Sequence, residues 1–298
     1  MFTTLVAAVV ALVLGHVAPA LVATVRSPRA YAQWLRWLGV QAGEEGFWRG
    51  RHGLLLAVLP PVLLVLAVQL LLVRPMWGLP GLLFGVLVLA WAWGPRDLDV
   101  DVEAALDADD PATRRARLDL LAPESGVEVV EGPALAGTVA RSALRRWFAV
   151  IFWFLLLGPA GAVLYRLCER AVAAHAGILP CANAAGARRW LDWLEWPVAQ
   201  LMTLTLALAG DFDLVFRAWR GAAGNRWRAV NAFLESAARA AVSRELADEA
   251  EDYRREGYMP VLVPGDLPEL RDAMSLVWRM LLLWLALLAL LVIAGWVG

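Results

Sequence analysis

Residues 53–73 read GLLLAVLPPVLLVLAVQLLLV, and residues 75–95, which follow Arg74, read PMWGLPGLLFGVLVLAWAWGP. Neither run contains Asp, Glu or Arg, and each is close to the ~20 apolar residues that an α-helix needs to cross a bilayer. The short connection around Arg74 predicts an antiparallel pair of transmembrane helices. These two runs decide the fold class, which we predict to be an all-α, polytopic integral membrane protein.

Other apolar runs extend this pattern to about six transmembrane helices in a single membrane domain of residues 1–298. The expected spans are about 1–25, 54–73, 77–94, 147–166, 193–210 and 277–297. The apolar core of the fifth span, 196–210, is only fifteen residues long. A buried or re-entrant helix therefore stays open as its alternative.

Composition excludes several classes of function. The chain is 60% hydrophobic and has a net charge of −1, so it offers no electrostatic footprint for nucleic acid. All 27 basic residues are Arg, which excludes a P-loop, a Schiff base and a Ser–Lys dyad. The three His residues form no HExxH motif, and there is no GxSxG motif. We predict no catalytic residues and no metal site from these patterns.

The distribution of Arg predicts the topology. With six spans, the segments 26–52, 95–146 and 211–276 share one side of the membrane, and they hold 21 of the 27 Arg residues. The positive-inside rule places these loops in the cytoplasm. Both termini are therefore expected on the outer, periplasmic side of a bacterial inner membrane.

The cytoplasmic loops are expected to contain amphipathic helices. Apolar side chains recur at helical spacing over residues 31–38, and again at steps of three and four over residues 227–241. Asp110 followed by Pro111 is typical of a helix start, and the helix is expected to run to about Leu121. Whether these helices contact lipid, a protein partner or the transmembrane bundle stays open.

Acidic residues alternate with apolar ones between Asp97 and Asp101. This pattern fits a strand or converging metal ligands, but it also fits a charge-rich surface helix. We favour the helix, because alternate residues on a helix do not share a face and no His lies nearby.

Cys168 and Cys181 follow the fourth span on the expected outer side, where disulfides are permitted. A disulfide between them and two free thiols are both compatible with the sequence. The spacing of thirteen residues does not by itself provide the required geometry.

Several short motifs together resemble a known family. They are GPRDL at 94–98, FW at 152–153, GPAGA at 158–162, YR at 165–166, LDW at 191–193, WP at 196–197 and GDF at 210–212. In this order they are similar to the AmpE family of inner-membrane proteins associated with β-lactamase induction. The resemblance runs from the second span through Asp211. It implies a regulatory or sensory protein in cell-wall recycling and the response to β-lactam antibiotics.

AmpE-like proteins are similar in turn to the membrane synthase of cobalamin biosynthesis, CobD/CbiB, which attaches the aminopropanol arm to the corrin ring. In that family, acidic and amide residues followed by Asp-Gly precede the fourth span. Here residues 137–146 read GTVARSALRR, so Arg stands in place of the carboxylates. An ATP-using amide synthase needs acids to hold Mg²⁺ or to act as a base. We therefore favour a non-catalytic regulator on an enzyme-derived scaffold.

An adenosylcobinamide-phosphate synthase-like enzyme is the alternative to the regulator. A small-molecule transporter has less support, since the spans contain few polar residues. Arg141, Arg145 and Arg146 either face an anionic ligand or anchor the fourth span at the membrane surface.

Polar residues next to span ends are the expected ligand-binding set. They are Arg96, Asp97, Arg141, Arg145, Arg166, Asp192 and Asp211. The expected partners are the lipid bilayer and either an anionic small ligand or a protein. The sequence identifies no cofactor and no oligomeric state.

Overall fold

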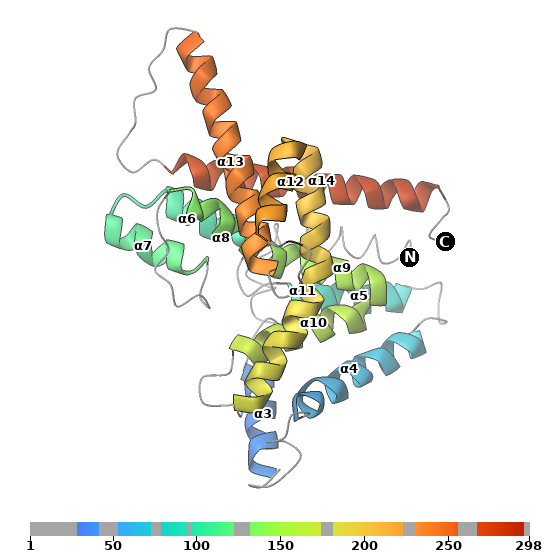
Figure 1. The fold of residues 1–298 in the computed structure, drawn as a ribbon. Coiled ribbons are helices and arrows are strands. Elements are labelled where there is room, and N and C mark those ends of the chain that lie inside the picture. The colour runs from blue at the N-terminus through green and yellow to red at the C-terminus, as the bar shows by residue number, and fades with distance from the viewer. Residues whose placement is uncertain are drawn as a thin grey trace. The chain divides into compact units, whose positions relative to one another are not determined.

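The computed structural model describes residues 29–41, 53–72, 79–93, 97–121, 132–173, 181–222, 224, 230–255 and 267–294. All regular secondary structure within these ranges is helical (Figure 1), which confirms the all-α class. The contacts divide the chain into two compact units. The first unit contains residues 1–95, 149–195 and 288–298, and the second contains residues 96–148 and 196–287.

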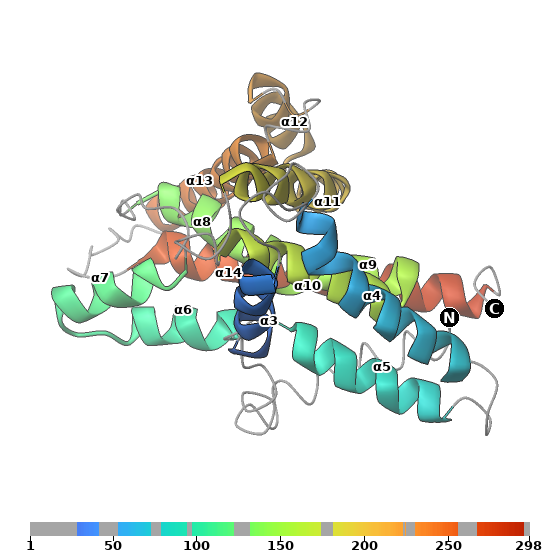
Figure 2. The same ribbon diagram turned by 90° about the horizontal axis from the view of Figure 1, so that it is seen from below.

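Helix α10 organises the first unit. The helices of this unit are α3 (Arg29–Gln41), α4 (Gly53–Leu72), α5 (Leu79–Ala92), α9 (Ala149–Leu157), α10 (Pro159–Ala173) and the first part of α11 (Cys181–Ala209). Helix α10 contacts α4, α5 and α9, and α4 also packs beside α5, as Figure 2 shows. The two apolar runs therefore form adjacent helices that share a third partner.

The bounds of α4 and α5 agree with the expected spans 54–73 and 77–94 to within about two residues. Both helices expose large apolar side chains, and Leu64 and Leu71 of α4 are 67% and 75% exposed. Two described helices, 53–72 and 268–290, are long and apolar enough to cross a membrane, and α5 is shorter. The expected first span, 1–25, lies outside the described residues.

The expected fourth span, 147–166, is interrupted at Gly158, which separates α9 from α10 with a φ of +70°. Glycine suits this left-handed conformation because it has no Cβ. The side chain of Gln69, from α4, bridges the break. Its Nε2 donates to the carbonyl of Leu157 at 3.3 Å, and its Oε1 accepts from the amide of Ala160 at 3.1 Å.

The second unit contains helices of more mixed polarity. They are α6 (Leu98–Leu106), α7 (Pro111–Asp119), α8 (Ala134–Ala143), the π-helical turn η3 (Leu144–Phe148), the last part of α11, α12 (Phe212–Gly221), α13 (Val230–Arg255) and α14 (Pro268–Ile293) up to residue 287. Helix α13 packs against α8 and α12, and α6 packs against α7.

The structure confirms the amphipathic helices. Helix α3 buries Tyr31 and Leu35 while Arg36 is exposed. Helix α7 begins at Pro111, and the carboxylate of its N-cap, Asp110, accepts from the amide of Thr113 at 2.9 Å. Hydrogen bonds from the backbone and then the hydroxyl of Thr113 lower the pKa of Asp110.

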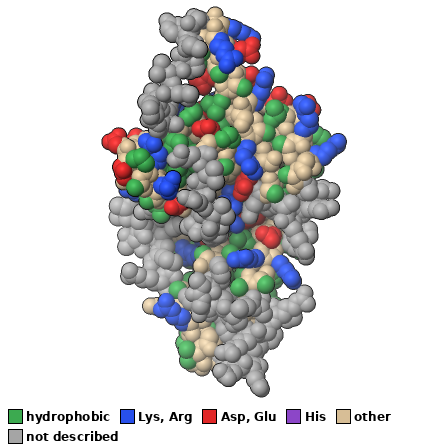
Figure 3. Space-filling view, turned by 60° about the vertical axis from the view of Figure 1, so that its left-hand side comes forward, with side chains coloured by type: hydrophobic (Ala, Val, Ile, Leu, Met, Phe, Trp, Pro, Cys, Tyr) green, Lys and Arg blue, Asp and Glu red, His purple; other side chains and the backbone are tan. Residues whose placement is uncertain are grey.

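Helix α13 contains residues 230–241 of the amphipathic helix expected over residues 227–241, and it continues to Arg255. Its buried stripe includes Phe233 and Ala237. At its C-terminal end, at the top of Figure 3, Arg255 pairs with Glu251 at 2.6 Å and lies 3.7 Å from Asp252. This end of the helix is therefore charged and solvated.

Two helices begin earlier than the apolar runs within them. Helix α11 starts at Cys181, before the expected span 193–210, and α14 starts at Pro268, before the expected span 277–297. Proline is favoured at the first helical position, and Glu269 complements the N-terminal dipole of α14. An apolar run marks the apolar part of a helix but does not mark where the helix begins.

Candidate functional site

The strongest candidate site in the second unit lies along α8 and η3. Helix α8 passes directly into the π-helical turn η3, which carries Arg145 and Arg146. Single π-helical turns within α-helices are rare and often occur at functional sites, because they change which side chains share a face.

Arg146 is buried, with 8% exposure. Its Nη1 donates to Oδ2 of Asp101 at 2.6 Å, and its Nη2 donates to the carbonyl of Leu120 at 2.7 Å. Asp101 is itself only 5% exposed. A charge-assisted bond of this length between buried groups ties η3 to α6 and to the end of α7.

Ser142 lies one helical turn before Arg146 and therefore on the same face. Its buried hydroxyl donates to the carbonyl of Leu121. The last carbonyls of a helix have no partner within that helix. Ser142 and Arg146 together satisfy two successive carbonyls after α7, at Leu120 and Leu121.

A second ion pair lies nearer to solvent. Nη1 of Arg141 lies 3.2 Å from Oε1 of Glu235, on α13, and their side chains are 21% and 25% exposed. The helices approach closely here, because a Cβ on Gly137 would lie 2.9 Å from the Cβ of Glu235. Both charged groups of this pair are partly open to solvent.

The acidic residues of α6 face different partners. Asp99 accepts from the indole of Trp278 at 3.3 Å, whereas Asp101 pairs with Arg146. The helix that we favoured for residues 97–101 is confirmed from Leu98 onward, although Asp101 is buried and not on the surface. Among the described residues, no three or more His, Cys, Asp or Glu side chains are grouped to hold a metal ion.

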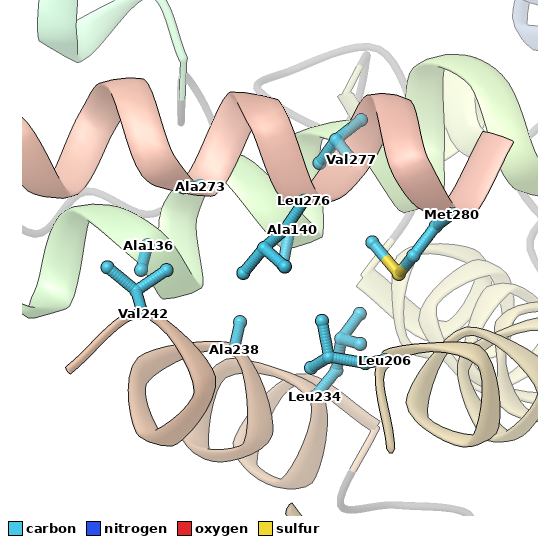
Figure 4. Close-up of a pocket in the computed structure, with 10 residues that line it drawn as sticks. All are labelled: Ala136, Ala140, Leu206, Leu234, Ala238, Val242, Ala273, Leu276, Val277 and Met280. Carbon is cyan, nitrogen blue, oxygen red and sulfur yellow. The ribbon is translucent and has the colours of Figure 1, made fainter. Parts of the chain in front are cut away.

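An apolar cavity lies beside the face of α8 that carries Ala136 and Ala140 (Figure 4). Its lining comes from α8, α11, α13 and α14 and consists of Ala136, Ala140, Leu206, Leu234, Ala238, Val242, Ala273, Leu276, Val277 and Met280. None of these side chains offers a hydrogen bond. The polar chemistry of α8 is therefore confined to the face that carries Ser142, Arg146 and the neighbouring Arg141.

The residues predicted to bind a ligand fall in both units. Asp97 is the half-buried N-cap residue of α6, and Arg145 is half-buried on η3. Asp211 is exposed and caps α12 by accepting from the amide of Leu214 at 3.1 Å. Arg141 lies in the second unit with these three, and Arg96 lies outside the described residues.

The other two predicted residues, Arg166 and Asp192, belong to the first unit. Arg166 is buried on α10, and Asp192 is half-buried on α11. Cys168 is a buried free thiol on α10. The side chain of Cys181 lies outside what the structure describes.

The predicted set missed the groups that complete the polar face of α8. Ser142 and Arg146 are four residues apart, a spacing that does place them on one helical face. Asp101 and Glu235, however, lie 45 and 94 residues away from their Arg partners in the sequence. No local pattern identifies pairs at such separations.

Comparison with known proteins identifies relatives in two bacteria. The chain is 32% identical to the cobalamin biosynthesis protein CobD of Stutzerimonas stutzeri, over 84% of each chain. It is also 32% identical to the cobalamin biosynthesis protein CobD of Chromobacterium violaceum, over 68% of each chain. No protein-family model and no solved structure matches the chain. The relatives favour our alternative, the cobalamin pathway, over the AmpE-like regulator.

Proposed function

Because the chain belongs to the CobD family of cobalamin biosynthesis proteins, we propose that it acts in cobalamin biosynthesis as a membrane-bound, synthase-like enzyme. The observation that carries this proposal is the extent of the match. A match of 84% of the chain has to include residues of both compact units.

The reaction that we propose is attachment of the aminopropanol arm to the corrin ring through an amide bond. Such chemistry requires carboxylates that bind Mg²⁺ or accept a proton. The approach to the fourth span has Arg in place of the acids of the enzyme family. The polar face of α8 nevertheless has two carboxylates beside it, Asp101 from α6 and Glu235 from α13. They weaken the objection that the site lacks acids.

We also propose that the protein resides in a bacterial inner membrane. The exposed leucines of α4 support this location, as do the length and composition of 53–72 and 268–290. An apolar helix that directs large apolar side chains outward is stable in lipid but costly in water. We propose about six spans, with both termini on the periplasmic side.

Complementation tests the proposed reaction. The intact gene is expressed in a strain that lacks the membrane synthase of cobalamin biosynthesis, and both corrinoid-dependent growth and the corrinoid species are measured. We expect growth to return with the arm attached. Asp101→Asn should lower the yield at least ten-fold, whereas Asp107→Asn, an exposed residue at the end of the same helix, should not.

Protein levels in the membrane fraction are compared for all variants, so that loss of folding is separated from loss of chemistry. Absence of corrinoid synthesis at a normal level of the intact protein would contradict the enzyme proposal.

An AmpE-like regulator is the second candidate, and one observation favours it. Both acids beside α8 are already paired with Arg, namely Asp101 with Arg146 and Glu235 with Arg141. Carboxylates neutralised in this way are poorer metal ligands and bases. The discriminating measurement is the ratio of β-lactamase activity with and without a β-lactam inducer, in the presence and absence of the gene. A changed ratio, restored by the gene, favours regulation.

A further inference from the structure

A group of buried polar side chains lies on α10 in the first unit, separate from the polar face of α8. Arg166 is its centre and is 1% exposed. Its Nε donates to the carbonyl of Ala92 at 2.6 Å, and its Nη1 donates to Oε2 of Glu169 at 3.0 Å. The remaining nitrogen, Nη2, is buried and has no hydrogen-bond partner among the described residues. A buried donor without a partner costs free energy, so it points to a missing acceptor.

A second guanidinium lies on the same face of α10, because Arg170 is four residues after Arg166. It stacks over the ring of Trp91, with 4.4 Å between its Cζ and the ring centroid. Burial, and then the nearby charge of Arg166, lower the pKa of Arg170 to about 10. Glu169 is bound by Arg166 and also interacts electrostatically with Arg170. The two guanidiniums repel each other, and an anion that binds both would relieve this repulsion.

Helix α3 contributes a third donor. Tyr31 is 7% exposed, and its hydroxyl is buried without a hydrogen-bond partner among the described residues. Burial, followed by the neighbouring Cys168, raises the pKa of this hydroxyl, so it keeps its proton and acts as a donor. Tyr31 also interacts electrostatically with Arg170.

We propose that Arg166, Arg170 and Tyr31 form a site for a phosphate group in the first unit. Phosphate fits this set, since it carries several acceptor oxygens and matches the fork of a guanidinium. Helix α10 continues from an apolar helix that we place in the membrane, so both a phospholipid headgroup and free phosphate are suitable sources. The site is independent of the cobalamin proposal.

The first experiment measures phosphate binding by the full-length protein, purified in a detergent without phosphate. The midpoint of thermal unfolding is followed against inorganic phosphate, with chloride at equal ionic strength as reference. We expect a saturable rise with phosphate. Arg166→Gln should weaken the apparent affinity at least ten-fold, whereas Arg36→Gln, on the exposed face of α3, should leave it unchanged.

Tyr31→Phe keeps the test valid if Arg166→Gln lowers the yield of folded protein. It removes only the hydroxyl, and we expect a three- to ten-fold loss of apparent affinity. Equal affinity for phosphate in the wild type and in folded Tyr31→Phe and Arg170→Gln would overturn the site.

A third arm identifies the source of the phosphate. The protein is reconstituted in nanodiscs that contain phosphatidylglycerol and released for native mass spectrometry. Lipid retained by the wild type and lost from Tyr31→Phe supports a headgroup, and a response to inorganic phosphate alone supports a free anion. No retained lipid and no response to phosphate would refute the proposal. Corrinoid complementation is scored separately, so failure of this site leaves the proposed enzyme untouched.

Discussion

Arg146 is held by two helices at once, because its guanidinium binds Asp101 on α6 and the carbonyl of Leu120 after α7. Both charged side chains are less than a tenth exposed. Removal of one partner leaves the other charge buried and unpaired, which costs about 3–5 kcal/mol. We expect Arg146→Met to lower the free energy of unfolding by about that amount, measured by denaturant titration in detergent.

Two controls accompany this prediction. Arg217→Met removes an exposed pair with Asp213 on α12, and such pairs contribute ~0–1 kcal/mol. The double variant Arg146→Met with Asp101→Leu should recover much of the loss, because no charge then stays buried. If Arg146→Met costs no more than Arg217→Met, the buried pair does not have the role that we assign to it.

Sequence patterns predicted the role of a single residue correctly where its hydrogen-bond partner lies nearby in the sequence. The prediction that a helix starts at Asp110 was correct, because the partner of this N-cap residue, Thr113, lies only three residues away. The partners of Arg141 and Arg146 were not predictable, since helical spacing relates only residues three or four apart. The candidate site on α8 therefore needed the structure, although its Arg residues stood out in the sequence.

At the scale of elements, Gln69 and Gly158 connect three helices. The carboxamide of Gln69 is bonded to both sides of the break between α9 and α10. Gln69→Leu would leave the carbonyl of Leu157 and the amide of Ala160 without this partner. In a bilayer no water replaces it, so we expect a cost of about 1–3 kcal/mol. The expected result is a lower unfolding midpoint than for Leu71→Ala, an exposed residue on the same helix. Equal midpoints would show that the bridge is dispensable.

Gly158 supplies an independent test of the same break. A Cβ at this position would lie 2.6 Å from Nε2 of Gln69, and the φ of +70° disfavours side chains. We expect Gly158→Ala to destabilise the protein by about 1–3 kcal/mol, measured by denaturant titration. Gly221→Ala is the matched control, because its added Cβ would contact nothing within 4 Å. A loss no larger than that of Gly221→Ala would contradict this account of the turn.

The apolar runs predicted α4 and α5 closely, because nearly every residue in them favours the same environment. The same rule missed the early starts of α11 and α14, where polar residues continue the helix beyond the run. It also missed the break at Gly158, because the neighbouring residues are apolar on both sides. Glycine followed by proline was the available signal.

For the whole molecule, the uneven distribution of Arg gives a testable topology. We expect residues 118 and 240 to lie on the cytoplasmic side, so fusions at Leu118 and Ala240 should give the cytoplasmic signal. A fusion at Ala184 should give the periplasmic signal. Alkaline phosphatase and a fluorescent protein, which report opposite sides, serve as paired reporters at each position. A periplasmic Leu118 would reverse the orientation.

Sequence established the all-α class but did not reveal the division into two units. Each unit is assembled from separate stretches of the chain, for example residues 96–148 with 196–287. Such assembly depends on contacts between distant segments, which hydrophobic patterns do not encode. The AmpE resemblance likewise rested on short motifs, whereas the match to CobD proteins extends over most of the chain.

The bridge between Gln69 and the broken helix also bears on biogenesis. Gln69 lies 88 residues before Leu157, so a ribosome makes α4 long before its partner exists. In a bilayer, the carboxamide of Gln69 has no hydrogen-bond partner from α9 and α10 until these helices are made. Until then, α5 or the insertion machinery has to shield it from lipid. The order of synthesis thus makes α4 dependent on a later part of the chain. A nascent chain that stalls before residue 157 would hold an incomplete, degradation-prone first unit in the membrane.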